Sequence, residues 1–154
     1  MPLIRVSDSV YEWLNAVKNA KGLSSINDAI ATLKNPNPGF PREVYSLTVT
    51  VPASTMITRE ENYIKFGEDV VITKVYVFFP DGVEDLVTCT LGAGSKEYAP
   101  KIISGDNKSL WIEPKLFVPA GTPIWAEIRN EDTTYPHTPT IEVEIEKIRE
   151  VELV

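Results

Sequence analysis

The sequence predicts an α+β protein in which a short, mainly helical segment precedes a larger all-β antiparallel sandwich. Apolar residues follow helical spacing over residues 7–35 and alternate with polar residues from residue 44 onward. A stretch with three prolines and a glycine, residues 36–43, separates the two patterns and is typical of a stiff linker. Turn-forming residues recur at short intervals through residues 44–154, as in a sandwich or barrel of many short strands.

The N-terminal segment contains a short strand candidate followed by two predicted helices. The strand candidate covers residues 2–7. The first helix can begin at Ser7 or Asp8, because their side-chain oxygens accept hydrogen bonds from free backbone N–H groups. The second helix is shorter and begins at Ser24 or Ser25. Each helix has one apolar face, which must be covered by a partner.

Helices of this length are marginal without tertiary packing, since isolated helices below ~12–15 residues are rarely stable. We therefore expect the segment to interlock with a second copy of the chain and to form a homodimer or a higher homo-oligomer. The apolar residues expected in the dimer core are Ile4, Val6, Val10, Trp13, Leu14, Val17, Ile26, Ile30 and Leu33.

Residues 4–14 and 21–30 present, in order, a strand, a polar cap, a helix, a Gly-Leu-Ser turn and a second helix. This pattern resembles the ribbon-helix-helix family of Arc- and MetJ-type proteins. The resemblance covers less than a quarter of the chain and implies that residues 1–35 form a ribbon-helix-helix dimerisation unit. A generic helical hairpin packed on the β domain is the alternative.

The same resemblance implies a surface for DNA, because the paired strands of this family enter the major groove. Leu3 and Arg5 would face outward, and of these Arg5 can make the bidentate contact that specifies guanine. Ser24 and Ser25 would offer backbone N–H groups to a phosphate at the start of the second helix. The formal net charge of −7, however, is unfavourable for binding a polyanion. DNA binding is therefore the lesser alternative to pure self-association.

The C-terminal segment, residues 44–154, has roughly ten strand candidates. Residues 142–152 alternate charged residues with Ile or Val, which is typical of an edge strand protected by charge. The turns at residues 79–82 and 118–122, with the polar loop at 130–140, are similar to jelly-roll-like β-sandwich domains of phage and archaeal-virus structural proteins. The loop is expected to expose Thr134, Tyr135 and His137. The predicted strands cover residues 45–51, 56–58, 63–66, 71–79, 86–91, 99–103, 109–112, 115–118, 123–129 and 140–148.

The sequence contains little that points to catalysis, and we expect no catalytic residues, no cofactor and no metal. Cys89 is the single cysteine and stands in an apolar alternating stretch, which predicts a small buried hydrophobe rather than a nucleophile. The single histidine excludes a His-rich metal site. No nucleophile elbow, P-loop or dinucleotide fingerprint is present.

Two ligand classes stay open as alternatives. Oxygen-rich loops at residues 81–85, 105–107 and 130–132 could converge on calcium, although acidic turn residues are usually turn formers. Trp111, Trp125 and Tyr135 could stack on a sugar, but the apolar strands around both tryptophans favour core packing for them.

These observations favour a non-enzymatic structural or assembly protein of a virion or another mobile element, with other virion proteins as further partners. A ribbon-helix-helix DNA-binding regulator, with the sandwich as sensor or oligomerisation domain, is the first alternative, and a glycan- or calcium-binding module is the second. The start of the chain does not resemble a signal peptide, and no stretch approaches ~18 consecutive apolar residues. We therefore expect no membrane association and a cytoplasmic location, or a virion if the protein is viral. The absence of glutamine and the many Lys, Glu, Ile and Val residues indicate a thermophile-like composition.

Overall fold

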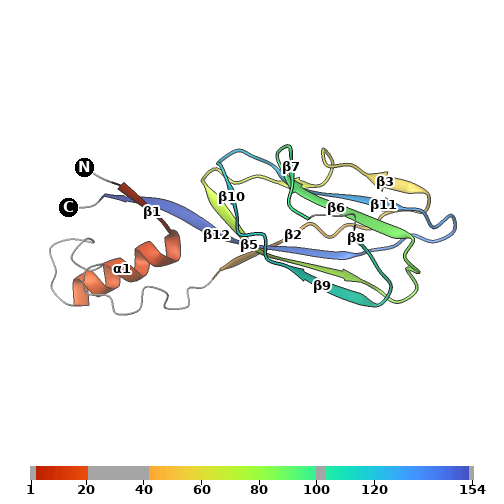
Figure 1. The fold of residues 1–154 in the computed structure, drawn as a ribbon, viewed down its shortest axis with the longest axis horizontal. Helices are drawn as coiled ribbons and strands as arrows, with labels where there is room; N and C mark the ends of the chain where they lie inside the picture. Colours follow the sequence, from red (N-terminus) through yellow and green to blue (C-terminus); the bar gives the residue numbers. More distant parts are fainter. Residues whose placement is uncertain (1–2, 21–41, 100–102, 153–154) are drawn as a thin grey trace.

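The structure, a computed structural model, describes residues 3–20, 42–99 and 103–152. These residues form two six-stranded antiparallel sheets and one helix, α1 (Asp8–Ala20). Figure 1 shows the sheets stacked face to face, with α1 and strand β1 (Leu3–Ser7) at one end of an elongated molecule. The described chain is thus mainly β rather than α+β. The second predicted helix, like most of the predicted linker, lies outside the described residues.

The first sheet is built around β12 (Thr140–Glu152). On one side β12 pairs with β5 (Val70–Phe79). On its other side it pairs with β2 (Glu43–Ser46) and, further along, with β1. The far side of β5 pairs with β9 (Lys108–Ile112) and β10 (Leu116–Val118). β12 therefore has a strand on both sides at residues 142–145, whereas residues 146–147 pair with β5 alone and residues 149–152 with β1 alone.

The prediction that residues 142–152 form an edge strand is wrong for residues 142–145, which have β5 on one side and β2 on the other. Ile141, Val143 and Ile145 are fully buried between the sheets, whereas Glu142 on the same strand is exposed. An inner strand with one face in solvent has the same alternation as a charged edge strand. The pairing partners of the strand, which lie far away in the sequence, decide between the two.

The second sheet is built around β11 (Ile124–Asn130) and β6 (Val87–Ala93), which pair along their whole lengths. Two short strands pair with the other side of β11 and two pair with the other side of β6. They are β3 (Thr55–Ile57), β4 (Tyr63–Ile64), β7 (Lys96–Glu97) and β8 (Ile103–Ser104). β3, β4, β6 and β11 lie within about two residues of predicted strands, whereas β8 shares only Ile103 with the strand predicted at residues 99–103, and β7 was not predicted.

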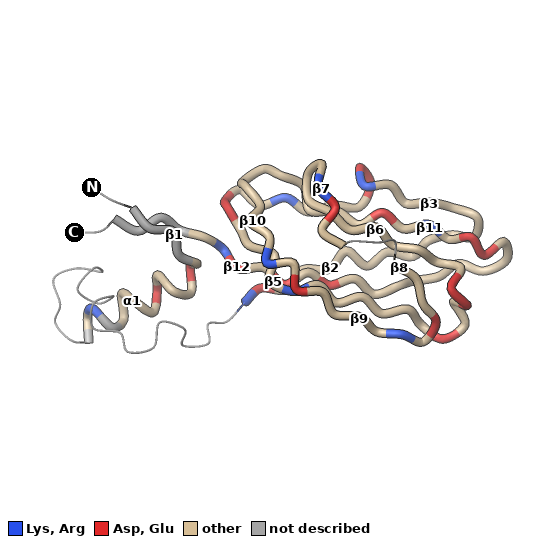
Figure 2. The backbone as a smooth tube through the Cα atoms, in the orientation of Figure 1, with Lys and Arg blue, Asp and Glu red and all other residues tan. Residues whose placement is uncertain are grey.

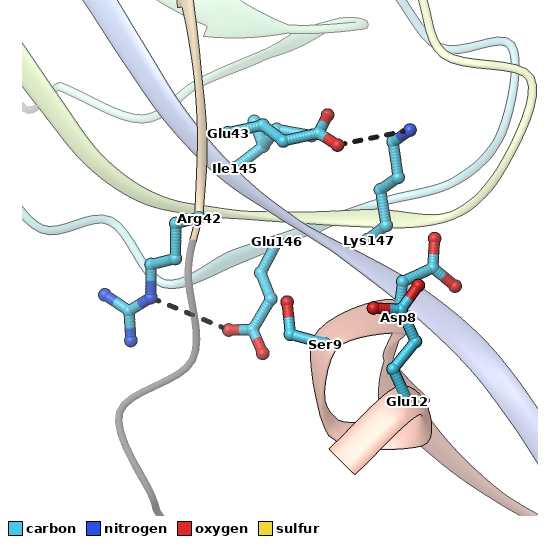
Figure 3. A pocket seen from close by; sticks show the side chains of 8 residues that line it. All are labelled: Asp8, Ser9, Glu12, Arg42, Glu43, Ile145, Glu146 and Lys147. Atoms are coloured by element: carbon cyan, nitrogen blue, oxygen red, sulfur yellow. Dashed lines mark ion pairs between the residues drawn. The ribbon is translucent and has the colours of Figure 1, made fainter. Parts of the chain in front are cut away.

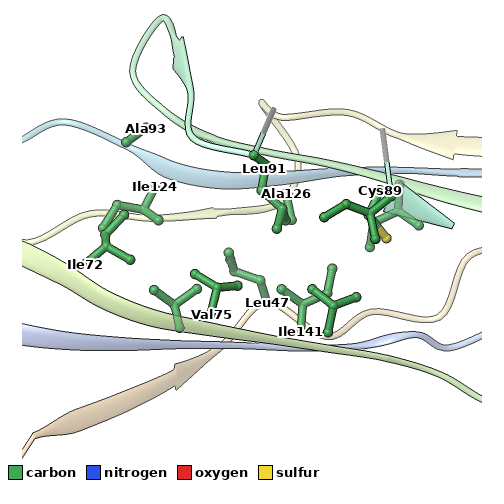
Figure 4. Packing of buried hydrophobic residues seen from close by; sticks show 14 of the residues in the cluster. Leu47, Ile72, Val75, Cys89, Leu91, Ala93, Ile124, Ala126 and Ile141 are labelled. Atoms are coloured by element: carbon green, nitrogen blue, oxygen red, sulfur yellow. The ribbon is translucent and has the colours of Figure 1, made fainter. Parts of the chain in front are cut away.

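The core fills the space between the sheets with side chains from alternate positions of the long strands. Figure 4 shows these side chains meeting from both sheets, with Ile72, Val75 and Ile141 on one side and Leu91 and Ile124 on the other. Cys89 lies among them and is fully buried, as the sequence predicted. Burial raises the pKa of its thiol to about 12, so the thiol stays protonated and unreactive at neutral pH.

Trp125 lies on the outer face of the second sheet, because its strand neighbours Ile124 and Ala126 face the core. The side chain is nevertheless only 1% exposed. The indole lies over Gly92 on the neighbouring strand, where a side chain would overlap the ring. The Arg59 guanidinium covers the ring at 3.8 Å from its centroid, and the indole N–H donates to the Gly94 carbonyl at 2.8 Å. The predicted burial of Trp125 is confirmed, but on the outer face of the sheet.

Candidate functional site

The last part of β12 leaves the sandwich and carries the N-terminal elements. Residues 148–152 pair antiparallel with β1, and α1 follows β1 directly. We call β1, α1 and residues 148–152 the arm (Figure 1). The Ser7 hydroxyl accepts a hydrogen bond from the Val10 backbone N–H at 3.3 Å, so Ser7 is the cap of α1 among the two residues, Ser7 and Asp8, that the sequence offered. Leu14 is 1% exposed, which shows that this chain alone already covers part of the apolar face of α1.

The two edges of β1 differ in hydrogen bonding. In an antiparallel ladder, the N–H and C=O groups of one residue point to the same side, and successive residues alternate sides. The Ile148 N–H donates to the Asp69 carbonyl at 2.9 Å, on the β5 side of β12. Arg149 and Val151, which alternate with Ile148 along β12, therefore face β1, where they are in register with Val6 and Ile4. Ile4 and Val6 thus supply the hydrogen bonds between β1 and β12.

The remaining residues of β1 direct their backbone groups away from β12. By the same alternation these residues are Leu3, Arg5 and Ser7. Among the described strands none pairs with this outer edge, because β1 is the last strand of its sheet. The arm therefore presents a row of backbone donors and acceptors ready to pair with another strand.

The predicted dimer-core residues lie partly in the arm. Strand β1 contains Ile4 and Val6, and α1 contains Val10, Trp13, Leu14 and Val17. The other three predicted dimer-core residues, Ile26, Ile30 and Leu33, lie outside the described residues. The same is true of Ser24 and Ser25 of the predicted DNA surface. The sequence predicted that β1 pairs with a second copy of the chain. In the structure β1 pairs instead with β12 of the same chain. The alternation of apolar and charged residues in β12 continues to residue 152, so this strand extends beyond the sandwich. A ribbon-helix-helix unit is not seen in the described part of the chain, which contains one helix.

A cleft of about 390 Å³ separates α1 from the sandwich, and Figure 3 shows Asp8, Ser9 and Glu12 of α1 facing Glu146 and Lys147 across it. The two cations of its lining are held in ion pairs. Arg42 lies 3.9 Å from Glu146, and Lys147 lies 3.5 Å from Glu43. Ligand pockets usually have mainly apolar walls. We therefore interpret the charged cleft as the junction between the arm and the sandwich rather than a ligand site.

Asn130 is the buried anchor of the loop between β11 and β12. It is 1% exposed, and its Nδ2 donates to the carbonyls of Val51, Pro52 and Tyr135 at 3.1, 3.2 and 2.9 Å. Its Oδ1 accepts a hydrogen bond from the Asp132 N–H at 2.9 Å. Buried polar groups must be paired, so this network holds the loop in one conformation.

Asp132 organises the tip of the same loop. Its Oδ1 accepts hydrogen bonds from the backbone N–H groups of Thr134 (2.8 Å) and Tyr135 (3.1 Å), and its Oδ2 lies 2.7 Å from Nε2 of His137. The Thr134 N–H, followed by the hydrogen bonds from His137 and Tyr135, lowers the pKa of Asp132. Thr134 and Tyr135 are exposed, as predicted. His137 is not, because its contact with Asp132 leaves 13% of its side chain exposed.

The three oxygen-rich loops that suggested calcium do converge, at the end of the sandwich remote from α1. The Glu84 N–H donates to Asp106 Oδ1 at 3.0 Å, and the Glu131 N–H donates to the Leu86 carbonyl at 2.8 Å. Acidic residues gather at this end in Figure 2. Within residues 3–20, 42–99 and 103–152, however, no group of three or more His, Cys, Asp or Glu residues is arranged to hold a metal ion. The carboxylates of Asp106 and Asp132, which accept hydrogen bonds from backbone N–H groups here, act in turns.

Trp111 lies on the outer face of β9, and the prediction that it packs in the core is wrong. It is 64% exposed, whereas its strand neighbours Leu110 and Ile112 pack against the core. Its ring lies against that of Tyr76, with centroids 4.6 Å apart and planes inclined by 41°. The sequence of an apolar strand does not show whether its tryptophan faces the core or the solvent. The register of β9 with β5 decides which face Trp111 takes.

Comparisons with known proteins show a similarity to solved structures. No protein-family model matches the chain. No curated protein matches it. Among solved structures, the chain is similar to a chain of the cyanophage Pam1 capsid asymmetric unit, at 18% identity and a TM-score of 0.43, over 77% of this chain and 95% of that chain. In the part of the chain that the structure describes, no helix has the length and apolar character to span a membrane.

Proposed function

We propose that this chain is a non-enzymatic structural protein that assembles with further copies of itself. The outer edge of β1 forms the contact between copies. The described arm has two paired strands and one helix. A two-stranded ribbon is marginally stable at best, and a third strand or a packed helix stabilises it. An open edge strand is a template for pairing with another chain. The observation that supports the proposal is this open edge, held away from the sandwich.

The pairing that we propose is symmetric, as in most homo-oligomers. The β1 strands of two copies lie antiparallel, and the backbone groups of Leu3 and Arg5 in one copy bond to those of the other. The product is a continuous sheet with the order β12, β1, β1, β12, which carries one α1 from each copy. This proposal keeps the strand pairing that the ribbon-helix-helix resemblance implied. It adds residues 148–152 to the small assembly unit that the sequence predicted.

The sandwich, in the same proposal, is a jelly roll that forms the body of the subunit. Its strands pair in nested order: β2 with β12, β3 with β11, β5 with β10, and β6 with β8. One long antiparallel hairpin that wraps into two sheets gives this order, which is typical of viral capsid and lectin domains. The setting that we propose is a virion, in line with the resemblance of the turns at residues 79–82 and 118–122 and of the loop at residues 130–140 to phage and archaeal-virus structural proteins.

The test is a proline at the outward-facing position of β1. Proline has no backbone N–H, so it is tolerated on an edge strand where that group is unpaired. Arg5→Pro removes the outward N–H and leaves the hydrogen bonds of Ile4 and Val6 to β12 in place. We expect the wild-type protein to sediment as an oligomer and Arg5→Pro as a smaller species, with the same thermal unfolding of the sandwich.

The matched control is Arg5→Ala, which removes the same side chain but keeps the N–H. This variant should sediment like the wild type. A monomeric wild type at micromolar concentration would overturn the proposal, and so would an Arg5→Pro protein with an unchanged mass. A large closed shell or filament, seen by electron microscopy of the wild type, would support the virion setting.

A further inference from the structure

The outer face of the first sheet carries an aromatic pair that contributes nothing to the core. The pair consists of Trp111, 64% exposed, and Tyr76, partly exposed on the neighbouring strand. The registers of the sheet place Trp111 opposite Tyr76, Tyr76 opposite Glu142, and Glu142 opposite Ser46. These four side chains form one row across four strands, with two rings at one end and a carboxylate and a hydroxyl at the other. We call it the aromatic row.

The aromatic row is short and open. Neighbouring strands lie ~4.8 Å apart, so roughly 10 Å separates Glu142 from Trp111. The next row toward the acidic end consists of Thr140, Phe78 and Ser109, which adds hydroxyl groups beside the rings. The surface therefore alternates apolar ring faces with hydrogen-bonding groups over the width of three or four strands.

The surroundings of the aromatic row are too polar for a stable protein interface. Toward the arm, the Arg42–Glu144 ion pair (3.1 Å) separates the row from Phe117, the next exposed aromatic residue on this face. Phe117 is in register with Val71, five residues from Tyr76 along β5. Trp111, Tyr76 and the partly exposed Phe78 of the next row together bury at most roughly 450–750 Å². A standard protein interface needs ~800 Å² on each partner and has few charges at its centre.

The chemistry of the aromatic row distinguishes between small ligands. A sugar ring has apolar C–H faces, which suit an aromatic ring, and hydroxyls at its rim, which donate to carboxylate and hydroxyl oxygens. A cation is held within ~6 Å of a ring centroid. A cation over Trp111 would lie about two strands from Glu142, beyond reach of that carboxylate. We propose that the aromatic row binds a neutral pyranose glycan, with one sugar ring on Trp111 and the next extending over Tyr76 toward Glu142.

The test uses the full-length protein and three soluble probes: cellohexaose, maltohexaose and chitohexaose. Each is titrated while the indole N–H signal of Trp111 is followed by NMR. We expect a saturable shift with at least one probe and binding about tenfold weaker, or lost, in Trp111→Ala. Glu142→Gln should weaken binding several-fold. Tyr135→Ala is the matched control, since Tyr135 is 65% exposed in the loop between β11 and β12 and is not a member of the row, so its loss should change nothing.

Three results would overturn the proposal. The first is the absence of a saturable shift with all three probes at millimolar concentration. The second is a shift produced by tetramethylammonium, which would assign the row to a cation. The third is a lower assembly mass in Trp111→Ala, which would make the row a contact between copies. Because the row is separate from the arm, Arg5→Pro should bind the glycan as the wild type does, whatever its oligomeric state.

Discussion

At the scale of single residues, Gly92 shows how the second sheet accommodates Trp125 on its outer face. A Cβ at Gly92 would overlap the indole and would lie 2.6 Å from the Lys96 carbonyl oxygen. We expect Gly92→Ala to lower the free energy of unfolding by ~1–3 kcal/mol, because the ring must shift from its place. Urea denaturation measures this change. Gly67→Ala is the control, since no atom lies within 4 Å of a Cβ there. Equal stability of the two variants would contradict the packing described.

The Asp132 carboxylate predicts a pH dependence of the loop between β11 and β12. Its hydrogen bonds lower its pKa below the ordinary 3.8, so the folded loop favours the ionised form. The stabilisation is complete above the unfolded pKa and is lost as the pH falls through the folded value. Between about pH 5 and pH 2, protection of the Thr134 and Tyr135 amides from hydrogen exchange should fall relative to β5. In Asp132→Asn the protection should no longer vary over this range, and the same pH dependence in that variant would exclude Asp132 as its source.

At the scale of elements, the arm and the sandwich should unfold separately. Leu14 is 1% exposed, and truncating a buried leucine costs ~2–5 kcal/mol. We expect Leu14→Ala to increase hydrogen exchange in residues 8–20 and 148–152 and to leave β5 and β11 protected. The reason is that the described contacts of α1 are with β1 and β12, and the charged cleft lies between α1 and the sandwich. An equal loss of protection in β5 would show that the arm and the sandwich form one cooperative unit.

The elements also show how far the sequence can predict this structure. Local patterns predicted the strands, the Ser7 cap, α1 and the burial of Cys89, because each depends on neighbouring residues. The side of a strand that faces solvent, and the strand beside it, depend on residues far away. Trp111 and Trp125 stand in similar apolar strands, yet one is exposed and the other buried. The pairing of β1 with residues 148–152 joins the two ends of the described chain, and no local pattern encodes it.

At the scale of the whole molecule, charge favours association through the arm. The formal charge is +1 over the first 35 residues and −8 over the rest. Figure 2 shows acidic residues at the end of the sandwich opposite the arm. Like charges repel, so contact between two acidic ends is unfavourable, whereas contact between two arms keeps these ends apart. Assembly through the arm would therefore point the acidic loops and Tyr135 outward.

The most direct test of assembly through the outer edge of β1 compares amide hydrogen exchange at Arg5 and Val6 in the wild-type protein. The Val6 N–H is paired with β12 inside one copy, whereas the Arg5 N–H points to the open edge of β1. We predict that both amides are protected in concentrated protein and that dilution removes the protection of Arg5 first. An Arg5 amide that exchanges at the unprotected rate at every concentration, beside a protected Val6, would contradict assembly through β1.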